Sequence, residues 1–182
     1  MTTNDVAERT LSRDELKAMG EILLPFEPSV PLNISWEGAA LLDQRKAKVD
    51  PSRVRERPSV KFTPEPGAYY TLALVGPDGP NHNTSSGSSC FCHRVWRHWL
   101  VVNIRGNEVQ KGDEVTDYSG PSPPKGAGLR RYTFVLFKQP SSIVWTPLMN
   151  DARGRSGFSI NDWVIRHRLQ PVGCQLFFAD AS

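Results

Sequence analysis

Prolines constrain the fold of this chain more than any other feature. Fifteen of the 182 residues are proline, and they divide the sequence into short pieces. Because proline lacks a backbone N–H and breaks helices, this spacing disfavours a helical bundle. Strand-like runs, rich in β-branched and aromatic residues, lie between the breaks. They span residues 30–36, 69–75, 99–104, 132–137 and 175–179.

Two short helices are predicted beside these strands. Ser12 begins a capping box that ends at Glu15, which predicts an N-terminal helical segment over residues 1–25. Ser159 can cap a second helix, in which Trp163 lies on an apolar face at helical spacing. Many short strands with a few short peripheral helices predict a mainly β chain, folded as a sandwich or a barrel.

Length, charge and cysteine content narrow the class of protein. A single domain over residues 1–182 is expected, because a domain typically has about 150 residues. The net charge of +3 is too small by itself to indicate nucleic acid. The N-terminus lacks the basic and apolar blocks of a signal peptide, and no apolar run approaches the roughly 18 residues of a membrane span. Three cysteines argue against a closed disulfide framework, so a cytoplasmic protein is predicted.

Three segments are predicted to be loops from their composition. Residues 45–61 are strongly basic, residues 76–93 are rich in Gly, Asn and Ser, and residues 117–128 are dense in Pro and Gly. The last loop is either the rigid wall of a preformed pocket or a stiff connector without a ligand. The basic segment fits a peripheral contact with an anionic membrane or an acidic partner, although such a run is more often a solvated loop with a charged edge strand.

Three motifs follow one another along the chain. The first runs from Tyr70 to Pro80, the second contains Trp96 and the run His98-Trp99-Leu100-Val101-Val102-Asn103-Ile104, and the third runs from Tyr118 to Phe134. In their order and spacing they make the chain resemble the phosphatidylethanolamine-binding protein family, which includes the Raf kinase inhibitor proteins and the plant flowering-time regulators. The resemblance covers nearly the whole chain, apart from a loop insertion over residues 81–93.

The resemblance implies an antiparallel Greek-key β-sandwich with a small anion pocket at one end. The pocket would take a phosphate or a phospholipid headgroup, and His98 would supply its imidazole. The ligand-binding residues that it implies are Asp78, Pro80, Trp96, His98, Gly120, Pro124, Arg130 and Tyr132. An imidazole N–H, a phenolic hydroxyl and glycine amides are hydrogen-bond donors, which match the acceptor oxygens of an anion.

Two positions depart from the family pattern. Gly76 stands where the family has an aspartate, and Arg130 stands where it has a histidine. The pocket loses a counter-ion for an ammonium group and gains a guanidinium that can grip phosphate with two N–H groups. Alternatively, the Arg130 side chain folds into the pocket and occupies it, which would leave only a scaffold.

The inserted loop carries a small cluster of sulfur and imidazole groups. Cys90, Cys92 and His93, with His82 nearby, are ligand types for a soft metal ion. Zinc sites normally show two ligand pairs at regular spacing, which this cluster lacks. We therefore predict free thiols in a flexible insertion, and no metal site.

These observations predict a binding module rather than an enzyme. It would take small anions or phospholipid headgroups and regulate a protein kinase or another signalling partner, without cofactor and without direct readout of nucleic acid. No Gly-x-Ser-x-Gly or comparable nucleophile accompanies His98, so no catalytic residue is assigned. The alternative is a structural subunit of a larger assembly, with a vestigial pocket.

Overall fold

A computed structural model describes residues 23, 25–36, 39–40, 47–78, 95–145 and 152–180. Several sequence predictions fall outside these ranges. They are the helix that begins near Ser12, the insertion over residues 81–93 with Cys90, Cys92 and His93, and Pro80 among the site residues.

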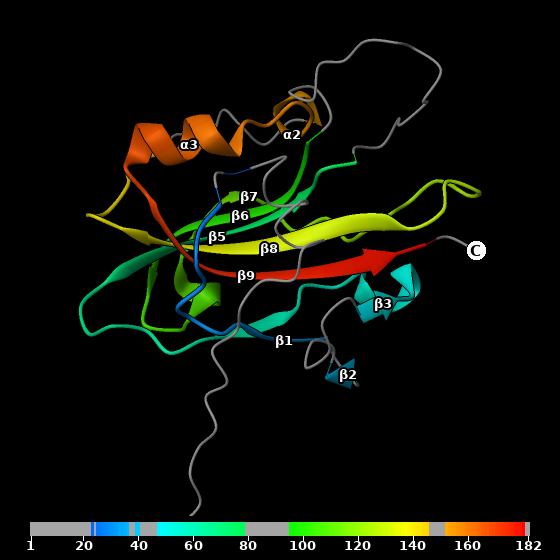
Figure 1. Cartoon of the computed structure of the whole chain (residues 1–182). Helices are drawn as coiled ribbons and strands as arrows, with labels where there is room; N and C mark the ends of the chain where they lie inside the picture. The colour runs from blue at the N-terminus through cyan, green and yellow to red at the C-terminus, as the bar shows by residue number, and fades with distance from the viewer. Residues whose placement is uncertain are drawn as a thin grey trace, which may run out of the picture.

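Within the described residues, nine strands form two sheets that face each other (Figure 1). They are β1 (Asn33–Trp36), β2 (Ala39–Ala40), β3 (Ala47–Val49), β4 (Ser59–Lys61), β5 (Tyr69–Gly76), β6 (Trp96–Arg105), β7 (Asp113–Thr116), β8 (Arg130–Gln139) and β9 (Gln170–Ala179). One sheet has the order β2-β1-β4 and the other β3-β9-β8-β5-β6-β7. The order β8-β5-β6-β7 within it is a Greek key. The predicted mainly β sandwich is confirmed.

The basic segment is more structured than its composition indicated. Residues 45–61, predicted as a loop, contain β3, the 3-10 helix η1 (Pro51–Val54) and β4. β3 lies at the edge of the large sheet, where it pairs with β9 in parallel, while the other pairs are antiparallel. The described basic side chains of this segment, Lys48, Arg53, Arg55, Arg57 and Lys61, are exposed. Short edge strands with outward charges resist pairing with other chains, which explains why composition alone suggested a loop.

Helices cover the face of the large sheet that the small sheet leaves open (Figure 1). They are α2 (Ala152–Arg155) and α3 (Ile160–His167), and a second 3-10 helix, η3 (Val109–Lys111), precedes β7. The predicted cap of α3 is confirmed, because the Ser159 hydroxyl accepts a hydrogen bond from the Asp162 amide at 3.2 Å. Within the described ranges, no helix is long and apolar enough to span a membrane.

The central strand β5 is buried on both faces. Leu72 and Leu74 pack toward the small sheet, and Ala73 and Val75 pack in the cluster that contains α3 residues. Thr71, a polar residue of β5, is also fully buried and donates a hydrogen bond to Gln139 Oε1 at 2.8 Å. The helical layer covers the second face, which a local pattern does not reveal.

Candidate functional site

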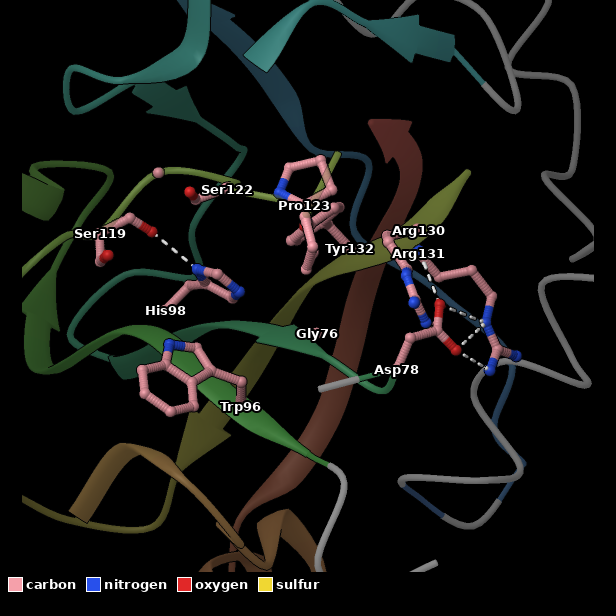
Figure 2. Close-up of a pocket in the computed structure, with 12 residues that line it drawn as sticks. Gly76, Asp78, Trp96, His98, Ser119, Ser122, Pro123, Arg130, Arg131 and Tyr132 are labelled. Atoms are coloured by element: carbon pink, nitrogen blue, oxygen red, sulfur yellow. Dashed lines mark hydrogen bonds and ion pairs between the residues drawn. The ribbon is translucent and has the colours of Figure 1, made fainter. Parts of the chain in front are cut away.

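A cavity of about 240 Å³ lies at one end of the large sheet (Figure 2). Three strand ends meet there, because Gly76 ends β5, Trp96 begins β6 and Arg130 begins β8. Register brings them together: Gly76 pairs with Trp96, and Val75 pairs with a β8 residue. Pockets for drug-sized ligands have volumes of about 300–1,000 Å³, so this cavity suits a smaller group.

The structure gathers the predicted site residues that it describes around this one cavity. They are Asp78, Trp96, His98, Gly120, Pro124, Arg130 and Tyr132, while Pro80 lies outside the described residues. Ser119, Ser122, Pro123 and Arg131 also line the cavity and were not selected from the sequence. All four lie inside the third motif, so their place in that motif was the available signal. Ligand binding by all of these residues stays a prediction.

A buried arginine ties the cavity wall to the sheet. The Arg155 guanidinium, on α2, donates to the carbonyl oxygens of Arg97 at 3.3 Å, His98 at 3.1 Å and Asp117 at 3.0 Å. It also forms an ion pair with the Asp117 carboxylate. The Ser119 amide donates to the His98 carbonyl at 2.9 Å. The segment 117–124 is therefore docked on β6 as a preformed wall.

Gly120 has a packing role that the sequence did not indicate. A Cβ atom on this residue would lie 2.5 Å from the Val54 carbonyl oxygen and 3.0 Å from the Arg55 Cα. The Tyr118 hydroxyl donates to the same Val54 oxygen at 2.8 Å. Sequence reasoning assigned the glycine to backbone approach by a ligand. The structure shows that its missing side chain lets the wall pack against η1.

His98 presents a hydrogen-bond acceptor to the cavity, which corrects the expectation of a donor. Its Nδ1 lies 2.8 Å from the Ser119 carbonyl oxygen. A carbonyl oxygen only accepts, so Nδ1 carries the proton and Nε2 of the neutral ring keeps a lone pair. Burial lowers the pKa of His98 to about 4, opposed by the Ser119 hydrogen bond and assisted by the charge of Arg155. The ring is therefore neutral at pH 7.

Gly76 leaves the Nε2 atom of His98 uncovered. A Cβ atom at Gly76 would lie 3.1 Å from Nε2 and 3.6 Å from a ring carbon of Tyr132. The His98 and Tyr132 rings meet edge to face, with centroids 5.1 Å apart. Burial raises the pKa of Tyr132 to about 12 against the opposing charge of Arg130, so its hydroxyl keeps its proton as a donor.

The carboxylate of Asp78 is already engaged by a neighbouring arginine (Figure 2). Arg131 donates to it from its backbone amide at 2.8 Å and from its guanidinium at 2.6 Å and 3.1 Å. Burial acts to raise the pKa of Asp78, but the hydrogen bonds and charge of Arg131 prevail and lower it. Asp78 is therefore ionised and directed at Arg131 rather than open to a cationic headgroup.

Arg130 lines the cavity without filling it. Its Nε is buried and has no hydrogen-bond partner within the described part of the chain. Its charge acts on both Asp78 and Tyr132, which places the side chain between them (Figure 2). Because Arg131 balances Asp78, the guanidinium of Arg130 gives the described cavity lining one excess positive charge.

Comparisons with known proteins agree with the fold. The family model described as phosphatidylethanolamine-binding protein matches residues 39–172. Odorant-binding protein A5 of Drosophila melanogaster is 27% identical over 178 residues, which are 96% of this chain and 80% of that protein. Carboxypeptidase Y inhibitor, solved in complex with its cognate proteinase, superposes with a TM-score of 0.75 at 18% identity, over 98% of this chain and 100% of that one. A phosphatidylethanolamine-binding protein from Plasmodium vivax gives 0.68 at 19% identity, over 92% and 97%.

Proposed function

The chain belongs to the phosphatidylethanolamine-binding protein family, and we propose that it is a binding module whose cavity takes a small anion, above all a phosphate group. The observation that carries this proposal is the Arg130 guanidinium, which lines the cavity with its Nε unpartnered. A buried guanidinium nitrogen without a partner favours an anionic ligand, because a charge-assisted hydrogen bond to phosphate would satisfy it. The Tyr132 hydroxyl and the Ser122 hydroxyl add further donors to the lining.

The same lining offers little to the ammonium group of an ethanolamine. Gly76 removes the carboxylate that the family carries at this position, and Arg131 engages Asp78, the one carboxylate of the described lining. The proposal therefore places recognition in the phosphate, whether it comes free, on a small ester or on a lipid headgroup. A lipid source would involve peripheral contact with a membrane.

Calorimetric titration with inorganic phosphate and phosphoethanolamine tests this proposal. Wild-type protein should bind both with similar affinity. Arg130→Ala should weaken binding about ten- to a hundredfold, since a charge-assisted hydrogen bond contributes roughly 1.5–3 kcal/mol. Arg166→Ala, which removes an exposed guanidinium on α3, is the matched control and should leave affinity unchanged.

Unchanged or tighter phosphate binding by Arg130→Ala would contradict the proposal. It would mean that Arg130 blocks the cavity, and the alternative role as a structural subunit would then lead. A structural subunit should occur mainly in a stable complex. The mass of the native protein, purified from its own cells, therefore distinguishes the two roles.

A binding role agrees with the surroundings of His98. Its Nδ1 is held by a backbone carbonyl, and within the described residues no hydroxyl or thiol is hydrogen-bonded to its Nε2. A nucleophile activated by histidine needs that second contact. Regulation of a protein kinase or another signalling partner is the further role that the resemblance implies. The exposed arginines beside the cavity wall, on and after η1, are a surface that such a partner could contact.

A further inference from the structure

We propose that the cavity selects a phosphate that still carries a proton, which means inorganic phosphate or a phosphomonoester as its monoanion, and that His98 Nε2 accepts this proton in a hydrogen bond. The inference rests on the proposed function, because it concerns the same cavity. It assigns His98 a role in specificity that is separate from the charge recognition by Arg130.

The cavity wall sets the direction of the imidazole ring. The hydrogen bond from Nδ1 to the Ser119 oxygen, 2.8 Å long, commits the ring proton to the cavity wall. The Ser119 amide and the Arg155 guanidinium both donate to the His98 carbonyl oxygen, so His98 and Ser119 are held in this relative position. The lone pair of Nε2 therefore has a fixed direction.

The lone pair of Nε2 is accessible from the cavity. Gly76 has no side chain to cover Nε2, and a Cβ atom there would lie 3.1 Å away. His98 is 7% exposed and lines the cavity. A ligand oxygen that enters the cavity can therefore approach Nε2 directly.

The charges around the imidazole ring disfavour a second proton on it. Tyr132 lies edge to face against the ring from β8, Arg155 lies beside it from α2, and Arg130 and Asp78 line the same cavity. Arg131 balances Asp78, and Arg155 is paired with Asp117 of the wall. The groups left without a carboxylate partner are neutral or cationic, so a second proton on the ring is disfavoured. The proton must stay on the ligand oxygen.

The ligand must carry a P–OH group near neutral pH. A phosphomonoester loses its second proton only near pH 6, so near neutrality a useful fraction still carries a P–OH group. Sulfate and phosphodiesters carry no such proton at that pH, and their oxygens would meet the Nε2 lone pair. The diester of a phospholipid headgroup is therefore disfavoured against a monoester or free phosphate.

Calorimetry with four probes at pH 6 tests this selection. Inorganic phosphate and methyl phosphate should bind at least tenfold more tightly than dimethyl phosphate and sulfate. Repeating the phosphate titration at pH 8, in two buffers of different ionisation enthalpy, should show uptake of close to one proton per ligand bound. Affinity should fall by up to about tenfold per pH unit above the second pKa of the ligand, since one proton is linked to binding.

A variant locates the effect in the imidazole. His98→Asn keeps an amide donor near the position of Nδ1 and deletes Nε2, so the preference for phosphate over sulfate should fall below about threefold and proton uptake should disappear. His167→Asn removes another described histidine, on α3, and should behave as wild type. Thermal melts show whether His98→Asn is folded; if it is not, the wild-type data decide.

Three results would overturn the inference. They are equal affinity of wild type for sulfate and phosphate, absence of proton uptake at pH 8, and full discrimination by folded His98→Asn. Each leaves anion binding intact, so the proposed function would survive. If no probe binds wild type at any pH, the proposed function fails and the inference fails with it.

Discussion

Burial strongly alters the ionisation of His98 in the cavity. Its ring lies against Tyr132 at a centroid distance of 5.1 Å, and its Nδ1 donates to the Ser119 carbonyl. Burial dominates and lowers its pKa to about 4. A histidine that is neutral over the physiological range contributes shape and a lone pair, whereas the permanent positive charge comes from Arg130.

This lowered pKa predicts how stability depends on pH. The pKa of His98 is about 4 in the folded protein and about 6.5 in the unfolded chain, so the unfolded chain binds the extra proton between these values. The free energy of unfolding should therefore fall as pH drops from 6.5 toward 4, with about 3 kcal/mol of the loss due to His98. Urea unfolding at pH 7.0 and 4.5 measures this. His98→Asn should lose less stability over the same interval; an equal loss would contradict the assignment.

The second residue-scale prediction concerns Gly76→Asp. The backbone there is not left-handed, so a side chain is conformationally allowed, but its Cβ would lie 3.1 Å from His98 Nε2. Phosphate should bind about tenfold more weakly, because the carboxylate adds negative charge and covers Nε2. The affinity ratio of phosphoethanolamine to phosphate should rise about threefold, because the new carboxylate can pair with the ammonium. Calorimetric titration measures both. Gly76→Asn, equal in size and uncharged, should weaken phosphate without raising the ratio.

At the scale of elements, the cavity depends on how one loop is held against β6 and η1. Gly120 lets the loop approach η1, and Tyr118 bonds to the same Val54 carbonyl. On the other side, Arg155 of α2 reaches carbonyl oxygens of both β6 and the loop. A four-residue helix thus fixes the wall that orients His98.

Removing the Arg155 guanidinium should loosen this wall. Arg155→Ala removes a charged donor from three carbonyl oxygens of β6 and the loop, so stability should fall by about 3 kcal/mol. Phosphate affinity should fall as well, because the Ser119 contact that orients His98 is no longer supported. Chemical denaturation and calorimetry measure the two effects. Arg166→Ala, on the exposed side of α3, should stay within about 0.5 kcal/mol of wild type. A similarly small change in Arg155→Ala would contradict the role given to α2.

At the scale of the whole molecule, the large sheet is shared by two cores. One core packs it against the small sheet, and the other packs it against α3. The cavity lies where strands that contribute to both cores end, so its residues belong to the same cooperative structure. Ligand binding at this end should stabilise the entire described fold.

Thermal unfolding tests this coupling. Phosphate at a hundred times its Kd should stabilise the protein by about 2.7 kcal/mol, which raises the Tm by roughly 5–10 °C for a chain of this size. Scanning calorimetry at pH 6 should show one transition that shifts as a whole, and sulfate at the same concentration should shift it less. Two transitions, with one insensitive to phosphate, would show that the cavity end unfolds separately.

The sequence determined the features that depend on neighbouring residues. Prolines and β-branched runs placed the main strands, Ser159 capped α3, and the three motifs pointed to the residues that gather around the cavity. The three motifs identify these residues together, because their order and spacing along the chain match the pattern of one family. The strand ends and the short strands within residues 45–61 were less visible, since edge strands are charged like loops.

The chemistry inside the cavity depends on contacts that form only in the folded protein. Arg131 engages Asp78 across 53 positions of sequence, and Ser119 sets the tautomer of His98 across 21. The burial that makes His98 neutral comes from residues on several elements. Charge pairing, proton position and burial depend on distances between atoms far apart in the chain, and local patterns carry no record of those distances.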